Sequence, residues 1–583
     1  FAEWVHQRAA ALGAERALCA MREGRFLQKI VDGASGVPGR HLGTQTVWAS
    51  RESCARASIY DGSEFELRSF LSRLNAPGPR QVSASLGLDA NDVPELRALI
   101  ADPGTPGAGD SSAGEAVIDL VLGREHLRQA VVDRSRLLRR RLVDHLAAAA
   151  GPGTGPVVVV DVGWAGTILE ALQRMLNAEG ADLSLHGLFV GAHVGSARPL
   201  LRGVPLEGYL GDSGLVPFDV AGITGNPELV ELACMCDEGS FLEMGEDGEP
   251  VLAPSSTTPL QREHRTLLQA GARAFQAAWL PQRDIDSSHE TSPAGRATLR
   301  RVLERFLSQP DRQEAEAFSW WGHEENFGSE QIDRLVPTKL RPTLHLRTVD
   351  SLHFAPPNEL YWVGGAASLV DEETADAIFL MRRGLLAPGR IDASLGIGSA
   401  GIFVVHADGT ERLVAEVPLL ANRRGISLVE WNGDPQGATE VRVRLAERPA
   451  ILRLDRLEVV YRDGSGATVN CRAWTPSTAM DGYVMRGATP LEDHTFAVDD
   501  RSRLTLTVPS GIGVRSTTVV VAGSYLPISR SREEVGARLD AVHRLTAFGR
   551  ELNKNYRTKL SRATTLPRGA YRRLRHALHR LET

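Results

Sequence analysis

The most regular hydrophobic pattern in the chain is VVVVDVGWAGTILEAL at residues 157–172. Its four consecutive valines do not alternate with polar residues, so they predict a parallel strand that is buried on both faces. We expect this strand to end at Asp161. Apolar residues recur at helical spacing from Ile168, so Gly163 and Gly166 predict a tight turn into a helix. In such a unit the unpaired N–H groups of the first helical turn form a natural anion site at the strand end.

Two earlier segments repeat this strand–loop–helix pattern. An apolar run at Ala17–Met21 leads through Arg22-Glu23-Gly24-Arg25 into a helix, and a run at Thr46–Ala49 leads through Ser50-Arg51-Glu52 into another. The loops after parallel strands gather at one edge of a doubly wound sheet. The pattern therefore predicts a Rossmann-like α/β domain with a binding site at that edge.

The pattern changes along the rest of the chain. We expect the α/β domain to span residues 1–282 with a helical insertion at 61–150, followed by a helical linker at 283–340. Short alternating runs separated by turns then predict an antiparallel β-sandwich at 341–528, with strands at Leu344–Thr348 and Ala377–Arg382 among others. The spacing of Leu452, Leu454 and Leu457 predicts a bulge in a long sandwich strand. A basic helical tail is expected at 529–583.

Composition narrows the class of protein. The 583 residues carry 42% hydrophobic and 24% charged side chains with a formal net charge of −6, as in ordinary globular proteins, and no global basic field recruits nucleic acid. The five cysteines are few and mostly lie in apolar runs, which favours a reducing compartment. We expect no transmembrane segment and no signal peptide. The start at Phe1 indicates a piece of a longer protein or a processed one.

The three loops supply the candidate chemistry. Asp161, Arg22 and Arg25 are predicted to be catalytic, with the arginines clamping an anion and Asp161 acting as a base or a metal ligand. Ligand contacts are expected from Glu23, Gly24, Ser50, Arg51, Gly163, Trp164, Gly166 and Thr167. Trp164 is expected to stack on a sugar or a base. Weaker candidates are His193, Asn226, Glu228 and Glu231.

A purely structural interpretation stays open. Asp161 could cap the following helix while the glycines only make the turn. The arginines could form internal ion pairs with Glu23, Glu52 and Asp161. The arginine run in the helix expected at 115–150 is interpreted as a solvated face. The C-x-C pair of Cys234 and Cys236 is interpreted as packing rather than as a metal site.

Three of these segments carry a family resemblance. Residues 1–30, 46–59 and 157–172 resemble, in this order, the second α/β region of large bacterial predicted hydrolases of the haloacid dehalogenase superfamily, which are encoded with capsule and O-antigen genes. The chain lacks their phosphatase motif, so aspartyl-phosphate chemistry is not carried over. Residues 157–172 also look like the diphosphate loop of type I phosphoribosyltransferases, although one of the two adjacent acids of that family is replaced by Val162. The β region resembles sandwich modules attached to glycosyltransferases.

The resemblance implies a role in bacterial surface-polysaccharide synthesis. We expect the α/β domain to bind a phosphorylated sugar or a nucleotide-sugar and to hydrolyse or transfer a phosphate ester, with Mg²⁺ as one candidate cofactor. The sandwich is expected to bind glycan or a glycosyltransferase. The alternative is a non-catalytic scaffold or glycan-binding accessory protein. A cytoplasmic location is expected, and the basic tail would serve either as a tether or for recruitment to the inner membrane surface.

Overall fold

The computed structural model divides into two compact units, which are described separately. Unit 1 comprises residues 1–337 and 360–365, and unit 2 comprises residues 338–359 and those from 366 onward. The structure describes residues 1–527 except for 35–41, 75–77, 90, 92, 102–110, 153–154, 213–221, 284–292, 325–331, 357–358, 423, 436, 465–466, 477–482, 493 and 510–512. The tail expected at 529–583 lies outside the described residues.

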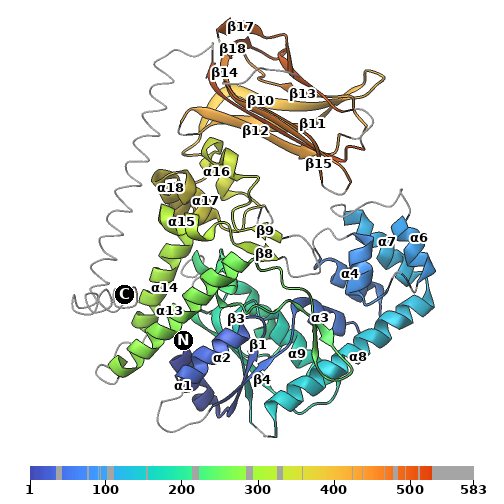
Figure 1. Cartoon of the computed structure of the whole chain (residues 1–583), viewed down its shortest axis with the longest axis vertical. Coiled ribbons are helices and arrows are strands. Elements are labelled where there is room, and N and C mark those ends of the chain that lie inside the picture. The colour runs from blue at the N-terminus through green and yellow to red at the C-terminus, as the bar shows by residue number, and fades with distance from the viewer. Residues whose placement is uncertain are drawn as a thin grey trace. The chain divides into compact units, whose positions relative to one another are not determined.

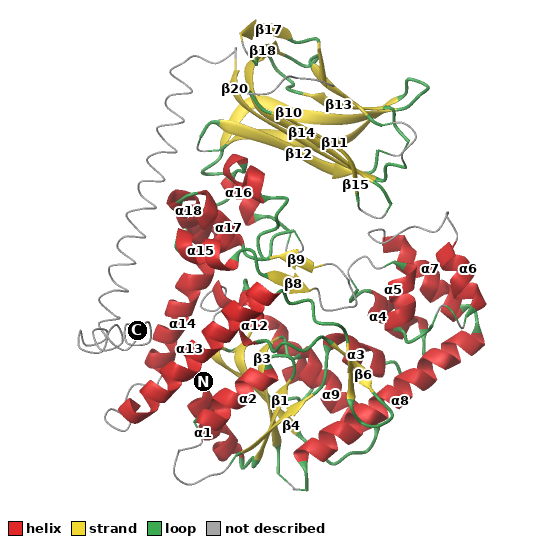
Figure 2. Cartoon of the chain, viewed as in Figure 1, coloured by secondary structure: helices red, strands yellow, loops and turns green. Residues whose placement is uncertain are grey.

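Unit 1 is built on a parallel five-stranded sheet, and the expected α/β class is confirmed (Figures 1 and 2). Its strand order is β2-β1-β3-β4-β5. The strands are β1 (Arg16–Ala20), β2 (Gly43–Val47), β3 (Val157–Trp164), β4 (Leu185–Ala192) and β5 (Leu206–Gly211). The run of valines in β3 therefore occupies the centre of the sheet, as a strand buried on both faces should.

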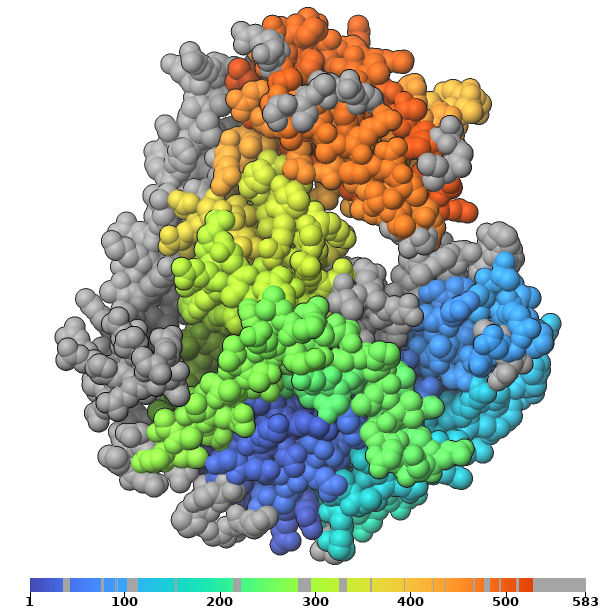
Figure 3. Space-filling view, viewed as in Figure 1, coloured from blue at the N-terminus to red at the C-terminus, as the bar shows by residue number. Residues whose placement is uncertain are grey.

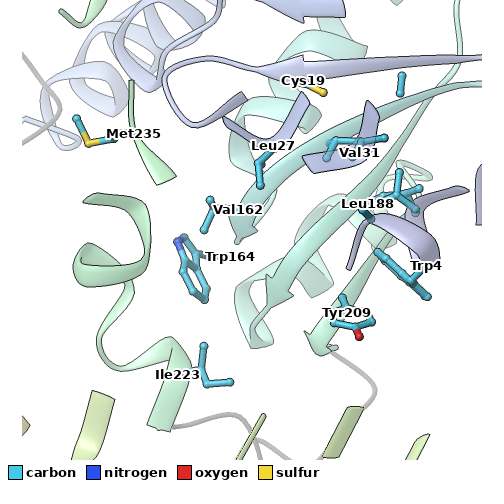
Figure 4. Packing of buried hydrophobic residues seen from close by; sticks show 14 of the residues in the cluster. Trp4, Cys19, Leu27, Val31, Val162, Trp164, Leu188, Tyr209, Ile223 and Met235 are labelled. Carbon is cyan, nitrogen blue, oxygen red and sulfur yellow. The ribbon is translucent and has the colours of Figure 1, made fainter. Parts of the chain in front are cut away.

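Successive residues of β3 enter two different cores. Val158, Val160 and Val162 belong to the same core as Trp4 of α1 (Ala2–Leu12). Figure 4 shows Val162 and Trp4 among the residues of this core. Val157 and Val159 instead join the core that contains Leu142 and Leu172. These last two residues belong to α8 (Glu125–Ala150) and α9 (Thr167–Ala178). The alternation of side chains along a strand thus explains why both faces are covered by helices.

Helices follow the first three strands closely. β1 leads into α2 (Gly24–Gly33), β2 into α3 (Arg51–Ala57) and β3 into α9. The segment expected as a helical insertion contains α4 (Glu64–Leu71), α5 (Pro79–Ser85), α6 (Pro94–Ala101), α7 (Ser111–Leu122) and α8. The first four of these helices surround a small core of their own that includes Leu67, Leu96 and Ile118.

The remainder of unit 1 completes these layers. It contains α10 (Ala197–Leu201), α12 (Pro227–Cys234), β6 (Phe241–Met244), β7 (Pro250–Leu252), α13 (Pro259–Arg283), α14 (Pro293–Ser308), α15 (Arg312–Phe318), β8 (Gly322–Glu324) and β9 (Ile332–Arg334). Residues 283–337, expected as part of a linker, belong to this unit. Trp321 and Leu335 are fully buried in the same core as Trp4, so the segment is part of the folded unit.

Unit 2 contains two antiparallel sheets, which confirms the sandwich-like class. One sheet has the order β11-β10-β13-β19-β16, and the other has β12-β20-β14-β18-β17 with β15 paired to β14. The strands are β10 (Ala393–Val405), β11 (Glu411–Ala421), β12 (Ile426–Gly433), β13 (Glu440–Arg444), β14 (Ala450–Arg462), β15 (Thr468–Trp474), β16 (Tyr483–Arg486), β17 (Thr489–Glu492), β18 (Thr495–Val498), β19 (Arg503–Thr507) and β20 (Ser516–Pro527). The predicted bulge is present, because the pairing with β20 shifts register between Leu454 and Arg456.

Two segments expected as strands are helical instead. Leu344–Thr348 overlaps the 3₁₀ helix η2 (Arg341–Leu346), and Ala377–Arg382 is the second half of α18 (Glu372–Arg382). The Asp371 side chain caps α18 by accepting the Thr374 N–H at 2.8 Å. Because residues 374–381 are all buried, the segment shows no amphipathic period that would separate helix from strand. α16 (Val349–His353) and α17 (Val363–Val370) are also helical.

Candidate functional site

A small cavity lies where β1, β2 and β3 end. Its volume is about 80 Å³, and its lining comes from loops that are far apart in sequence. The lining residues are Met21, Arg22, Glu23, Ala49, Ser50, Arg51, Asp161, Val162, Gly163, Gly166, Thr167, Ile168, Leu169, Phe189, Glu231, Ser240 and Phe241. Eight of the residues predicted as catalytic or ligand-binding line it together with the weaker candidate Glu231: Arg22, Glu23, Ser50, Arg51, Asp161, Gly163, Gly166 and Thr167. The carboxyl edge of the sheet therefore gathers the three loops, as a doubly wound topology requires.

Asp161 is the first residue of β3 that pairs with β4 but no longer with β1. Pairing with β1 stops at Val160, whereas pairing with β4 continues to Trp164. The expected strand end at Asp161 is therefore wrong, because β4 extends the strand by three residues beyond it. One carboxylate oxygen, Oδ1, accepts the Val162 N–H at 2.7 Å. This hydrogen bond orients the carboxyl of a residue that lines the cavity.

Burial makes Asp161 an unusual acid. It raises the pKa of Asp161 to about 7, with a further contribution from the negative charge of Glu231, while backbone N–H groups and Arg51 oppose the shift. A carboxyl with this pKa exists in both protonation states near neutral pH. It can therefore give or take a proton at physiological pH.

The loop after Asp161 needs its two glycines. Gly163 has φ 105°, and a Cβ there would lie 2.5 Å from Cβ of Phe189. Gly166 has φ 71° and is the N-cap of α9, with no side-chain capping hydrogen bond. The backbone therefore approaches the cavity closely, and the residues of the first turn of α9 line it. Uncapped N–H groups at a helix start attract an anion.

Glu23 and Arg22 also line the cavity. Glu23 is the N-cap of α2, and burial together with the charges of Glu231 and Asp161 raises its pKa to about 8, against the effect of Arg22. The preceding Met21–Arg22 peptide bond is cis. Two carboxyls with raised pKa values thus share one cavity, and each disfavours ionisation of the other.

Glu231 on α12 joins the loops into one network. Its Oε1 accepts the indole N–H of Trp164 at 2.8 Å and pairs with Nη2 of Arg51 at 3.3 Å. The purely structural interpretation of the sequence expects Glu23, Glu52 and Asp161 as partners of the arginines. The carboxylate that pairs with Arg51 instead comes from α12, and in the sequence it is only one of the weaker candidates.

Two predicted ligand residues, Trp164 and Gly24, and the predicted catalytic residue Arg25 have other roles in the structure. The Trp164 ring is only 5% exposed and packs in the core (Figure 4), so it has no free face for stacking. A Cβ on Gly24 would lie 2.4 Å from the Cys19 carbonyl oxygen, so Gly24 serves the close approach of α2 to β1. Arg25 pairs with Glu238 and lines a different cavity. The direction of a side chain within a loop decides its role, and the sequence pattern does not give that direction.

His323 is a neighbour that the sequence pattern does not reveal. It lies on β8, where burial and the positive charges of Arg22 and Arg51 lower its pKa to about 4. Its ring lies 4.9 Å, centroid to centroid, from that of Tyr361. The imidazole is therefore neutral at physiological pH. No motif in its segment connects it with the loops, so only the fold could reveal it.

The thiols near the sheet are unreactive. Burial raises the pKa of Cys19, Cys54, Cys234 and Cys236 to about 12 in each case. A protonated thiol is a poor nucleophile. Within the described ranges, no group of three or more His, Cys, Asp or Glu side chains is arranged to hold a metal ion. Among the helices described, none is long and apolar enough to cross a membrane.

No protein-family model matches this chain, and no curated protein matches it.

Proposed function

We propose that unit 1 binds a phosphorylated sugar or a nucleotide-sugar, with a phosphate group in the strand-end cavity, and that it hydrolyses or transfers a phosphate ester. The supporting observation is that Asp161, with a pKa of about 7, lies beside Arg51 and the uncapped start of α9. A proton-transfer group next to anion-binding groups is the arrangement that phosphate-ester chemistry uses.

The size of the cavity favours a phosphate over a larger group. One water needs roughly 10–15 Å³ of such space, so a cavity of this volume has room for about six water-sized groups. That is comparable with a phosphate and its first linked atoms and too small for a whole nucleotide. The rest of the ligand would extend outside.

The raised pKa values of Asp161 and Glu23 explain how a cavity lined by carboxyls can accept a phosphate. Three carboxyls line the cavity, and all three in ionised form would repel a phosphate. Because Asp161 and Glu23 titrate near pH 7 and 8, they are largely protonated at pH 6 and can donate hydrogen bonds to phosphate oxygens. Glu231 is partly neutralised by Arg51. We infer that phosphate binds more tightly at pH 6 than at pH 8.5.

In this proposal Asp161 either gives its proton to the leaving ester oxygen or takes a proton from the attacking water. Arg22 and Arg51 hold the phosphate with the N–H groups of α9. A role in bacterial surface-polysaccharide synthesis rests on the family resemblance of residues 1–30, 46–59 and 157–172. The scaffold alternative is supported by the Arg51–Glu231–Trp164 network, which also connects three elements structurally.

A thermal-shift screen distinguishes the phosphate-binding proposal from the scaffold alternative. The full chain is screened against sugar phosphates, nucleotide-sugars and inorganic phosphate at pH 6 and 8.5, with and without Mg²⁺, and the screen is repeated on Arg51→Gln and Asp161→Asn. Binding to the folded state raises its stability, by about 2.7 kcal/mol at a hundredfold excess over Kd. We expect one ligand class to raise the unfolding temperature of the wild type and to lose this effect in Arg51→Gln.

Arg136→Gln is the matched control. Arg136 has a side-chain exposure of 48% against 46% for Arg51, and a comparable ion pair at 3.6 Å. Loss of the ligand effect in both variants would mean general charge attraction. Absence of any ligand effect in the wild type would favour the scaffold.

A further inference from the structure

A second cavity lies in unit 1, outside the strand-end site. It has a volume of about 510 Å³ and is bounded by α2, by α13 and by the segment that follows α12. Figure 3 shows the green α13 segment against the blue N-terminal segment on the visible face. The lining residues are Arg25, Phe26, Lys29, Met235, Cys236, Asp237, Glu238, Arg265, Thr266, Gln269 and Arg273. A cavity of this volume is in the range that holds small-molecule ligands.

The walls of this cavity are fixed by hydrogen bonds. Nε2 of Gln276 on α13 donates to the Ile30 carbonyl of α2 at 2.6 Å. Nε2 of Gln269 donates to the Ala233 and Met235 carbonyls at 3.0 and 2.9 Å, and thereby connects α13 to the end of α12. The Cys236 N–H donates to the Arg22 carbonyl at 3.2 Å. The cavity is therefore formed before a ligand arrives.

Its lining carries a surplus of positive charge. Four cations, Arg25, Lys29, Arg265 and Arg273, face two carboxylates, Asp237 and Glu238, which leaves two positive charges in excess. Arg25 and Lys29 are four residues apart on α2, and Arg265 and Arg273 are eight apart on α13, so each pair lies on one helix face. Two basic helix faces thus meet at one cavity.

Arg265 is the feature that points to a ligand. Its side chain is only 3% exposed, and Nη2 pairs with Asp237. Nη1 is buried and has no hydrogen-bond partner among the described residues. Asp237 is half exposed and also pairs with Arg262 at 3.4 Å, so it neutralises Arg265 only in part. A guanidinium that is buried and only partly neutralised leaves an unbalanced positive charge at the cavity wall, and an anion in the cavity would balance it.

We propose that this second cavity binds a diphosphate group, either as inorganic pyrophosphate or as part of a nucleoside diphosphate. The two surplus charges match a ligand with at least two negative charges, and arginines hold phosphate oxygens well. Phe26 and Met235 give the cavity an apolar wall beside the charges. The inference does not depend on the proposed function, because none of these lining residues lines the strand-end cavity.

Isothermal titration calorimetry of the full chain tests this site. The probes are inorganic pyrophosphate, uridine diphosphate and adenosine diphosphate, each at low and high salt. We expect binding that weakens with salt, and about a tenfold higher Kd for each of Lys29→Gln and Arg273→Gln, whose exposed side chains can change without disturbing the fold. Arg265→Gln is expected to abolish binding. Tighter binding of a nucleoside diphosphate than of pyrophosphate would identify the nucleotide as the source of the diphosphate, and equal or tighter pyrophosphate binding would identify the inorganic form.

Two further variants separate the possible failures. Arg312→Gln removes an exposed arginine of α15 that pairs with Glu316 and should leave Kd unchanged. Arg51→Gln should also leave it unchanged, whatever happens to the strand-end site. The proposal is overturned if no probe binds, if Arg312→Gln weakens binding as much as Arg273→Gln, or if Arg51→Gln abolishes binding while Lys29→Gln and Arg273→Gln do not affect it.

Discussion

Asp161 makes the stability of the folded chain depend on pH. Its pKa rises from the ordinary 3.8 to about 7 on folding, so the native state holds the proton more tightly than the unfolded state. The resulting stabilisation is fully present below pH 3.8 and is lost as the pH rises through 7. Above pH 7 the protein carries a buried carboxylate that folding disfavours. A site of this kind is kept at the expense of stability.

Asp161→Asn removes this dependence. Asn keeps an oxygen for the Val162 N–H but carries no charge, so we expect the variant to be more stable than the wild type by about 2–4 kcal/mol at pH 8.5. The difference should shrink towards pH 5. Urea denaturation at several pH values measures it. A variant less stable than the wild type at every pH would mean that the carboxylate is needed for folding.

The conformation and close packing of Gly163 can be tested by its effect on stability. Its φ is 105°, and an added Cβ would lie 2.5 Å from the Phe189 side chain, so Gly163→Ala combines strain with overlap and should cost about 3–5 kcal/mol. Gly180→Ala is the matched control, because Gly180 has φ 71° and nothing within 4 Å, so about 1 kcal/mol is expected. Denaturant unfolding compares them. Equal losses would show that Phe189 moves aside freely.

At the scale of elements, the buried arginine of α8 could not be predicted. The run of arginines in this helix indicates a solvated face, yet Arg139 has a side-chain exposure of only 6%. Its guanidinium donates to the Ala57 and Ile59 carbonyls and to Glu179, and lies 4.4 Å from the centroid of the Tyr60 ring. These hydrogen bonds hold α8 against the end of α3.

Arg139→Ala should therefore destabilise unit 1. Two carbonyls and one carboxylate would lose their donor, which corresponds to about 2–4 kcal/mol. Arg136→Ala, three residues away and half exposed, should change the free energy of unfolding by less than about 0.5 kcal/mol. Urea denaturation of both variants measures the contrast. Similar small losses in the two would show that Glu179 and the carbonyls are satisfied by water.

Elements with a strong hydrophobic pattern could be predicted from the sequence, whereas the roles of single side chains within them were harder to predict. The valines of β3 allowed its central place to be predicted, because only a strand covered on both faces can bury four of them. α18 was predicted wrongly, because its residues are buried all round. Side-chain direction was harder still: Trp164 and Arg25 lie in the correct loops but point into the core and into another cavity. His323 required the tertiary fold.

At the scale of the molecule, each unit has a core that can be perturbed separately. Trp362 is fully buried in the first core, where its indole N–H donates to the Leu307 carbonyl at 2.7 Å, and Trp474 is fully buried in the sandwich core. Scanning calorimetry should show two transitions. Trp362→Ala should destabilise unit 1 by about 3–5 kcal/mol and lower the transition temperature of that unit. Trp474→Ala should lower the transition temperature of unit 2 instead. Equal movement of both transitions by either variant would contradict this division.

The discontinuity of unit 1 has a consequence for synthesis. Leu360–Gly365 belongs to unit 1, but residues 338–359 of unit 2 precede it in the chain. A nascent chain that has emerged through Pro337 already carries every candidate residue of both cavities, yet it lacks the tryptophan that closes the first core. The ribosome must translate into unit 2 before unit 1 can finish folding. During that interval the core that contains Trp4 lacks Trp362, so the apolar residues of that core stay incompletely covered until translation has passed residue 365.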